Sequence, residues 1–280
     1  SLQSIYYWKI LHKNMRTIKQ LMLMDNRTTL ITGATGGLGQ HMAETIAELG
    51  GGLILVDKPG SDYLLLMEIL KKYKCKVECI DCDLESDQQR IELIQQIDRK
   101  GFPVDVLINN AAFVAATELE GWVVPFEEQT IETWKRAIEV NLTAVFDLSK
   151  LLLPKLKKSG NGSIINIASI YGVNGPVHSM YKGTEMGNPA AYSTSKGGLI
   201  QLTRWLATTI SPEVRVNAIS PGGVYRNQPK SFVDQYEGRT PLKRMATEED
   251  FKGIVAYLAS DMSKYVTGQN INVDGGWGIW

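Results

Sequence analysis

The sequence contains only three cysteines, and their placement excludes a disulfide framework. Cys75, Cys79 and Cys82 lie within eight consecutive positions. Small secreted domains instead carry an even number of cysteines spread along the chain. This scarcity favours a reducing compartment, so we expect a cytoplasmic protein.

Long apolar runs and a charge excess are also absent. No run approaches the roughly 20 apolar residues that a transmembrane helix needs, so no membrane span is predicted. The 30 lysines and arginines balance the 30 aspartates and glutamates, which leaves no overall charge to attract nucleic acid. The remaining class is a globular protein that acts on small molecules, and 280 residues suffice for one large α/β domain.

Acidic residues are missing from residues 1–24, which carry four basic residues beside an apolar stretch at 5–8. Such a segment fits a transit peptide, a helix on a membrane surface, or an arm packed on a neighbouring subunit. We favour the packed arm. The chain is therefore divided into a basic N-terminal extension, residues 1–26, and one domain, residues 27–280.

From Thr28 onward, short β-branched runs alternate with amphipathic stretches, as in TTLIT, LILVD, VDVLIN, GSIINIA and EVRVNAI. Each parallel strand must return to the same end of the sheet through a crossover helix. No repeat or flexible linker divides this pattern. The sequence predicts a single α/β domain, a doubly wound parallel sheet of about seven strands with helices on both faces.

The first strand runs into a glycine-rich turn, ITGATGGLGQH at 31–41, that opens a helix. Glycines let backbone N–H groups approach a pyrophosphate, and the N-terminus of the following helix adds partial positive charge. The plainer alternative is a tight turn without a ligand. We predict a dinucleotide-binding site of the Rossmann type, and the residues assigned to it are Gly33, Thr35, Gly36, Gly37, Leu38 and Gly39.

The second strand ends at Asp57, followed by Lys58. A carboxylate there can hydrogen-bond the adenosine ribose diol of NAD and would repel the 2′-phosphate of NADP. Asp57 could instead be an ordinary strand-end residue. We predict contact of Asp57 and Lys58 with the cofactor, and we favour NAD over NADP.

Several further motifs follow in order: DL at 83–84, NNAA at 109–112, Asn141, IINIAS at 164–169, Tyr192 with Lys196, and RVNAISPGG at 215–223. With these motifs the chain resembles the short-chain dehydrogenase/reductase (SDR) family, classical branch, from about Arg27 to Gly276. The resemblance implies that Asp83 and Leu84 border the adenine, and that residues 109–112, with Asn110, Ala111 and Ala112, lie along the cofactor. It places Pro221, Gly222 and Val224 by the nicotinamide, and Gly36 where many NADP-binding relatives carry arginine.

Tyr192 and Lys196 are four residues apart in a predicted helix, so they share one face. A phenol has a pKa near 10, and a neighbouring ammonium together with the oxidised nicotinamide favours the phenolate. Tyr192 would then act as a general acid or base. By resemblance, Ser169 holds the substrate oxygen, Lys196 also holds the nicotinamide ribose, and Asn141 anchors a water molecule.

These residues predict an NAD-dependent oxidoreductase that interconverts an alcohol and a ketone by hydride transfer. Two alternatives stay open. One is a redox-neutral nucleotide-sugar epimerase or dehydratase with tightly bound NAD, because the Ser169–Tyr192 interval also resembles the extended branch of the superfamily. The other is a protein that binds NAD without catalysis.

Ser169 and Tyr192 are 23 residues apart, whereas about a dozen separate them in many classical relatives, so residues 171–191 read as an insertion. A loop at this end of the sheet would form substrate wall. We assign Tyr171, His178 and Tyr181 to the substrate, which we expect to be sugar-derived or otherwise polar, as in carbohydrate metabolism. Arg226 stands where a threonine often contacts the nicotinamide, and it could clamp a substrate phosphate or carboxylate.

The cysteine spacing Cys75-x3-Cys79-x2-Cys82 matches an iron–sulfur motif, but an extended strand would not bring three thiolates to one cluster. We predict no metal site. The C-terminal Trp277, Ile279 and Trp280 would be exposed in a monomer, so we expect this tail to pack against a second subunit of a homotetramer or dimer.

Overall fold

The computed structural model of the chain describes residues 15–280. Most of the basic segment predicted at residues 1–24 therefore lies outside the described residues. The remainder folds around one seven-stranded sheet in the order β3-β2-β1-β4-β5-β6-β7, with every pair parallel. The predicted single doubly wound α/β domain is confirmed.

The strands follow the β-branched runs of the sequence, because such side chains pack well when both faces of a sheet are covered. Every residue of β1 is buried, and so is every residue of β4 and β5. In sheet order the strands are β3 (Val77–Asp81), β2 (Gly52–Asp57), β1 (Thr28–Thr32), β4 (Val106–Asn109), β5 (Gly162–Ile167), β6 (Val214–Pro221) and β7 (Asn270–Val273).

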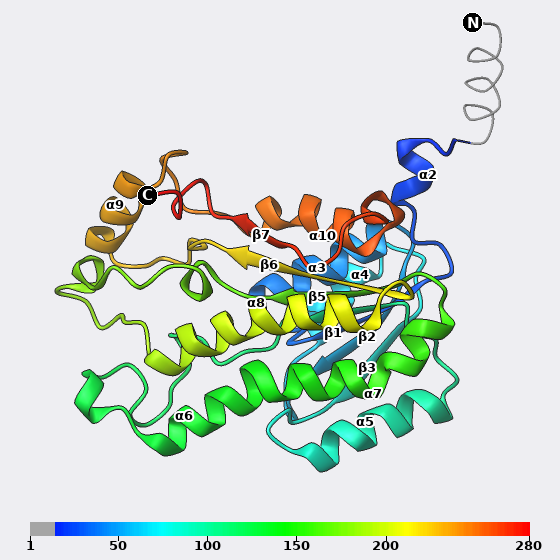
Figure 1. Ribbon diagram of the computed structural model, residues 1–280, viewed down its shortest axis with the longest axis horizontal. Coiled ribbons are helices and arrows are strands. Elements are labelled where there is room, and N and C mark those ends of the chain that lie inside the picture. The colour runs from blue at the N-terminus through cyan, green and yellow to red at the C-terminus, as the bar shows by residue number, and fades with distance from the viewer. Residues whose placement is uncertain (1–14) are drawn as a thin grey trace, which may run out of the picture.

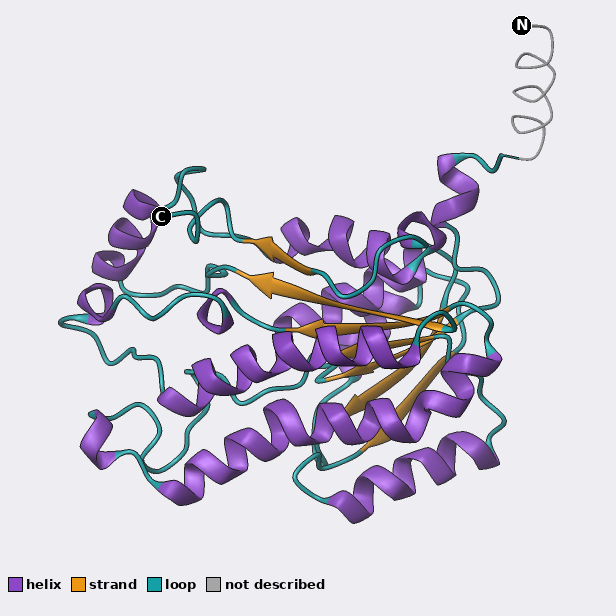
Figure 2. Ribbon diagram, viewed as in Figure 1, coloured by secondary structure: helices purple, strands orange, loops and turns teal. Residues whose placement is uncertain are grey.

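Two layers of helices cover the sheet (Figures 1 and 2). One face carries α3 (Gly37–Glu48), α4 (Leu64–Leu70) and α10 (Lys252–Ala259); the other carries α5 (Asp87–Arg99), α7 (Ala144–Lys158) and α8 (Ala190–Ile210). Successive strand residues point to opposite faces, so Ile31 joins the core cluster of α3, whereas Leu30 joins that of α7.

The strand order reverses beside β1. The chain builds β1, β2 and β3 toward one edge and then crosses to place β4 on the other side of β1. The connections that follow β1 and β4 therefore diverge, which opens a crevice at the carboxyl ends of the strands. The glycine-rich turn and the loop after Asn109 both lie there.

A π-helical turn interrupts the long helical stretch before β5. Helix α6 (Ile131–Ile138) continues through Glu139–Thr143 into α7, with five residues in π geometry. Such turns occur often at functional sites, because the extra residue re-aims a side chain. Here the turn contains the fully buried Asn141.

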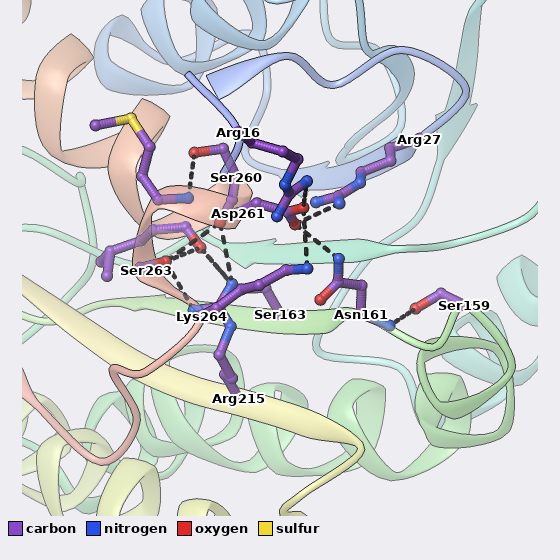
Figure 3. Close-up of polar contacts among 12 residues, drawn as sticks. Arg16, Arg27, Ser159, Asn161, Ser163, Arg215, Ser260, Asp261, Ser263 and Lys264 are labelled. Carbon is purple, nitrogen blue, oxygen red and sulfur yellow. Dashed lines mark hydrogen bonds and ion pairs between the residues drawn. The ribbon is translucent and has the colours of Figure 1, made fainter. Parts of the chain in front are cut away.

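The described part of the N-terminal segment packs on its own chain. Helix α2 (Ile18–Met22) starts at a capping box between Thr17 and Gln20, and Met24 is fully buried. Arg16 forms an ion pair with Asp261, which also binds Arg27, Asn161 and Lys264 (Figure 3). Within residues 15–280 no helix has the length and apolar character needed to cross a membrane.

The C-terminal tail corrects one sequence-based expectation. Trp277 is fully buried within its own chain, where its ring stacks on Tyr236 and meets the edge of Tyr171. Tyr236 lies on α9 (Lys230–Arg239). The prediction of an exposed Trp277 is therefore wrong, whereas Ile279 and Trp280 are exposed.

Candidate active site

A cleft of about 1410 Å³ runs along the carboxyl ends of the strands. Its walls come from the glycine-rich turn, the ends of β2 and β4, the start of α8 and the segments after β5 and β6. Sites for a single small ligand span roughly 300–1,000 Å³. This cleft therefore offers room for a dinucleotide and a small substrate together.

The glycine-rich turn is built for close backbone approach. Gly33 has a φ of 64°, and a Cβ there would lie 2.8 Å from the Ala111 Cα. A Cβ on Gly39 would lie 2.1 Å from the Gly33 carbonyl oxygen, so only glycine lets α3 start this close to the turn. Gly39 does not line the cleft itself, whereas Gly33, Thr35, Gly36, Gly37 and Leu38 do. The cradle fits a pyrophosphate group.

Asp57 lies at the end of β2, directly beside the turn. Its Oδ2 accepts hydrogen bonds from the Thr35 backbone N–H at 2.9 Å and from the Thr35 hydroxyl at 2.7 Å. Its Oδ1 accepts the Lys58 N–H at 2.9 Å. These contacts fix the carboxylate at the cleft wall, where a ribose diol could also donate to it.

The far end of the cleft is lined by Asp83 and Leu84. The buried Arg90 holds this loop: it donates to the Leu84 carbonyl at 2.5 Å and pairs with Glu139 and Asp147 at 2.8 Å each. Arg90 is not among the residues predicted from the sequence, although an arginine in the middle of an amphipathic helix can be buried when acidic partners lie nearby.

The two neighbouring asparagines of the NNAA motif have different positions. Asn109 is buried below the cleft and donates to the Asn166 side chain at 2.9 Å. Asn110 lines the cleft together with Ala111 and Ala112, and its amide donates to the carbonyls of Thr32 and Gly33 at 3.0 and 2.9 Å. Asn110 therefore supports the glycine-rich turn through its own side chain.

The structure brings Ser169, Tyr192 and Lys196 to one wall of the cleft. Tyr192 and Lys196 lie in the first turns of α8, and the Lys196 Nζ is 5.9 Å from the centre of the Tyr192 ring. The ammonium is buried and donates to the Ile167 carbonyl at the end of β5, at 2.7 Å. Strand β5 and helix α8 thus fix the lysine from two sides.

Burial disfavours the charged forms of both groups. Desolvation raises the pKa of Tyr192 above its usual value, and a hydrogen bond with Ser169 opposes this. Desolvation also lowers the pKa of Lys196 to about 7. The protein's own side chains therefore do not lower the pKa of Tyr192 as predicted. Lys196 does not offset the effect of burial, because its own pKa is lowered and its Nζ donates to the Ile167 carbonyl.

Asn141 stands behind this wall and does not line the cleft. Its Oδ1 accepts the Phe113 N–H at 2.7 Å, and its Nδ2 donates to the Phe113 carbonyl at 3.1 Å and to the Ser195 hydroxyl at 3.1 Å. Since Ser195 precedes Lys196, this amide connects the loop after β4 to the first turns of α8.

Tyr171 and Tyr181 line the other end of the cleft, and their hydroxyls are 2.6 Å apart. His178 is exposed and does not line the cleft. Arg226 does line it, but beside the glycine-rich turn rather than beside the tyrosines. Sequence reasoning missed several further lining residues: Phe113, Asn188, Phe232, Tyr236 and Met245. For Phe232 and Tyr236 the available signal was the apolar side of α9.

The three cysteines differ in their exposure. Cys82 is buried and Cys79 is exposed, and all three are free thiols. Burial raises the pKa of Cys82 to about 12, which leaves its thiol protonated and unreactive. Among residues 15–280, no three His, Cys, Asp or Glu side chains gather as a metal site would require.

Known proteins resemble this chain in sequence and in fold. A family model described as Enoyl-(Acyl carrier protein) reductase matches residues 33–278. The 3-oxoacyl-(acyl-carrier-protein) reductase FabG of Thermotoga maritima is 30% identical over 91% of this chain and 99% of its own length. The post-translational flagellin modification protein A of Campylobacter coli is 29% identical over 92% of this chain and all of its own. A short chain dehydrogenase from Leptospira borgpetersenii, solved with bound NAD+, is 32% identical with a TM-score of 0.79, covering 94% of this chain and 96% of that one.

Proposed function

The chain belongs to the short-chain dehydrogenase/reductase family, and from this premise we propose that it is an NAD-dependent enzyme that interconverts an alcohol and a ketone on a polar, sugar-derived substrate. The observation that carries the proposal is the shared cleft: Ser169, Tyr192 and Lys196 line the same cavity as the glycine-rich turn. Acid–base groups and a dinucleotide cradle are thus within reach of one substrate.

The residues of the cleft fit a dinucleotide. The turn excludes any Cβ at Gly33 and Gly39, and Asp57 presents a carboxylate at the end of β2. That carboxylate supports NAD over NADP, because a 2′-phosphate would meet like charge. When bound, the oxidised nicotinamide would accept the hydride and bring a positive charge close to the Tyr192 phenol.

Each side chain then has a defined task. The Tyr192 oxygen takes the proton of the substrate hydroxyl during oxidation and returns it during reduction. The Ser169 Oγ accepts the Tyr171 N–H at 3.2 Å, and its hydroxyl also hydrogen-bonds Tyr192. A substrate oxygen placed between these two hydroxyls would receive the Ser169 proton as that oxygen changes charge. The Lys196 Nζ donates one hydrogen bond to the Ile167 carbonyl, and its remaining N–H groups would donate to the nicotinamide ribose.

Asn141 is a positioning residue in this scheme. Its amide joins the Phe113 backbone to Ser195 and so sets the start of α8 against the loop after β4. A role in anchoring a water molecule stays a prediction from the family resemblance.

The cleft wall supports a neutral polar substrate. One of the two hydroxyls of Tyr171 and Tyr181 donates to the other. The hydroxyl that accepts this hydrogen bond still has its own proton, which it can donate to a ligand. Glu118 and Glu185 also line the cleft, and both would repel an anion. Hydroxyl donors and carboxylate acceptors together suit a polyol or sugar better than a phosphorylated or carboxylated compound.

We place the reaction in the cytoplasm, where three free thiols stay reduced.

The proposal is tested by the turnover of a panel of polyols and sugars with NAD+, and of a 3-oxoacyl thioester, which is a ketone, with NADH. Tyr192→Phe should lower kcat by roughly 10²–10⁴-fold, because the acid–base group is lost. Tyr265→Phe is the matched control, since Tyr265 is fully exposed. Unchanged turnover in Tyr192→Phe would overturn the acid–base role, and a clear preference for the thioester would overturn the substrate class. Retained NAD with no net consumption would instead identify a redox-neutral epimerase or dehydratase.

A further inference from the structure

Arg226 lies on the segment after β6, but its guanidinium reaches across the cleft to the start of α3. If a Cβ is placed on Gly37, its three nearest heavy atoms all belong to this guanidinium: Nη1 at 2.3 Å, Nη2 at 2.5 Å and Cζ at 2.7 Å. The arginine therefore fills the space that a side chain at position 37 would occupy. Gly37 is the first residue of α3, inside the glycine-rich turn.

A cation lies beside the N-terminus of α3. The N-terminus of a helix carries partial positive charge, so a cation there is stabilised by nearby anions: Glu248 supplies one, and a ligand phosphate in the cleft would supply a second. The N-cap of α3 is Gly36, which has no side-chain acceptor for the first N–H groups of the helix. Backbone donors and a guanidinium thus converge on one point of the cleft wall, which is the arrangement that a phosphate group binds.

Glu248 holds the guanidinium in this place. Its Oε1 is 2.9 Å from the Arg226 Nη1, and its side chain is 22% exposed. Within residues 15–280, no side chain or carbonyl other than Glu248 pairs with the Arg226 guanidinium. The planar group therefore keeps donors that can turn toward a ligand in the cleft.

The backbone of the segment is fixed independently of this ion pair. The Arg226 N–H donates to the Gln228 Oε1 at 2.7 Å, and the Gln228 amide donates to the Val224 carbonyl at 2.8 Å. The Tyr225 N–H donates to the Ala246 carbonyl at 2.9 Å. The loop thus aims Arg226 at the glycine-rich turn, away from the Tyr171–Tyr181 end.

We propose that Arg226 binds the diphosphate of the dinucleotide beside the α3 N-terminus, and that Glu248 positions its guanidinium. The proposal rests on the proposed function and replaces the sequence-based assignment of Arg226 to the substrate. It predicts that Arg226, on the segment after β6, contacts the cofactor rather than the reacting carbon of the substrate.

The test compares ligands with and without the diphosphate. Calorimetry gives the Kd of ADP-ribose for the intact chain and for Arg226→Met, and adenosine is measured by competition. Loss of a charge-assisted contact should raise the Kd of ADP-ribose about ten- to a hundredfold and leave adenosine unchanged. Lys230→Met is the control, because it removes the same charge from a side chain that is 86% exposed and outside the cleft.

A second measurement uses the contact with Gly37. Gly37→Ala should weaken ADP-ribose binding by displacing the guanidinium, and the same change in an Arg226→Met background should cost much less. Equal Kd values for the intact chain and Arg226→Met, or an equal loss for adenosine, would overturn the proposal. Additive effects of the two changes would do so as well.

The two proposals fail by different results. If Tyr192→Phe turns over normally while Arg226→Met loses ADP-ribose, the oxidoreductase scheme fails and the diphosphate contact stands. If the intact chain binds no ADP-ribose, the dinucleotide site and the role of Arg226 fall together.

Discussion

Replacing Asp261 by asparagine should destabilise the fold far from the cleft. The carboxylate is 4% exposed and accepts contacts from four side chains (Figure 3): Arg16 at 2.5 Å, Asn161 at 2.7 Å, Lys264 at 3.2 Å, and Arg27. Asparagine keeps the size of the side chain and removes its charge. The substitution therefore isolates the electrostatic part of this cluster.

The expected cost follows from the exposure of the partners. Breaking a buried ion pair costs about 3–5 kcal/mol, because one charge is left without compensation. Here the Arg16 and Lys264 side chains are 42% and 49% exposed, so water solvates them after the change. Arg27, at 17%, bears most of the loss. We expect Asp261→Asn to lower the free energy of unfolding by about 2–3 kcal/mol.

The pH dependence provides the sharper test. Burial alone would raise the pKa of Asp261, but hydrogen bonds from Arg27, Arg16 and Lys264 hold it well below its usual range. A lowered pKa contributes stability above the unfolded value near 3.9, and this contribution is lost as the pH falls toward the folded pKa. The difference between the parent and Asp261→Asn should therefore shrink by about 1 kcal/mol between pH 7 and pH 3.

Urea unfolding followed by tryptophan fluorescence measures both quantities. Asp234→Asn serves as the control, because Asp234 pairs with Lys230 on the surface, where both side chains are more than half exposed. That change should cost less than about 0.5 kcal/mol. Equal unfolding free energies for Asp261→Asn and the parent at pH 7, or a difference independent of pH, would refute the reasoning.

Two further predictions concern the cleft. Because burial lowers the pKa of Lys196 to about 7, the unfolded chain binds more protons than the folded one between pH 7 and about 10. The stability of the parent relative to Lys196→Met should then rise over this window, by at most about 1.4 kcal/mol per pH unit in urea unfolding; a flat difference would show that the ammonium stays charged. Asp57→Ser should improve the Kd of NADP relative to NAD by at least about tenfold, because like charge at the 2′-phosphate is removed, and an unchanged ratio from fluorescence titration would remove Asp57 from cofactor choice.

Short-range patterns determined the parts of this protein that sequence reasoning could reach. The alternation of strands and helices fixes a parallel sheet, because a strand covered on both faces must be apolar throughout. The spacing of Tyr192 and Lys196 places both on one face of α8, since four residues make about one helical turn. The glycine-rich turn was also predictable, because its residues are close together in the sequence.

The positions of the loop side chains depend on tertiary contacts. His178 and Arg226 both follow strands that end at the cleft, yet His178 is exposed and Arg226 reaches Gly37. Trp277 is buried because α9 and the segment after Ser169 fold back to meet it, a contact between residues far apart in sequence. The path of a loop depends on such distant contacts, and these cannot be predicted from the residues of the loop itself.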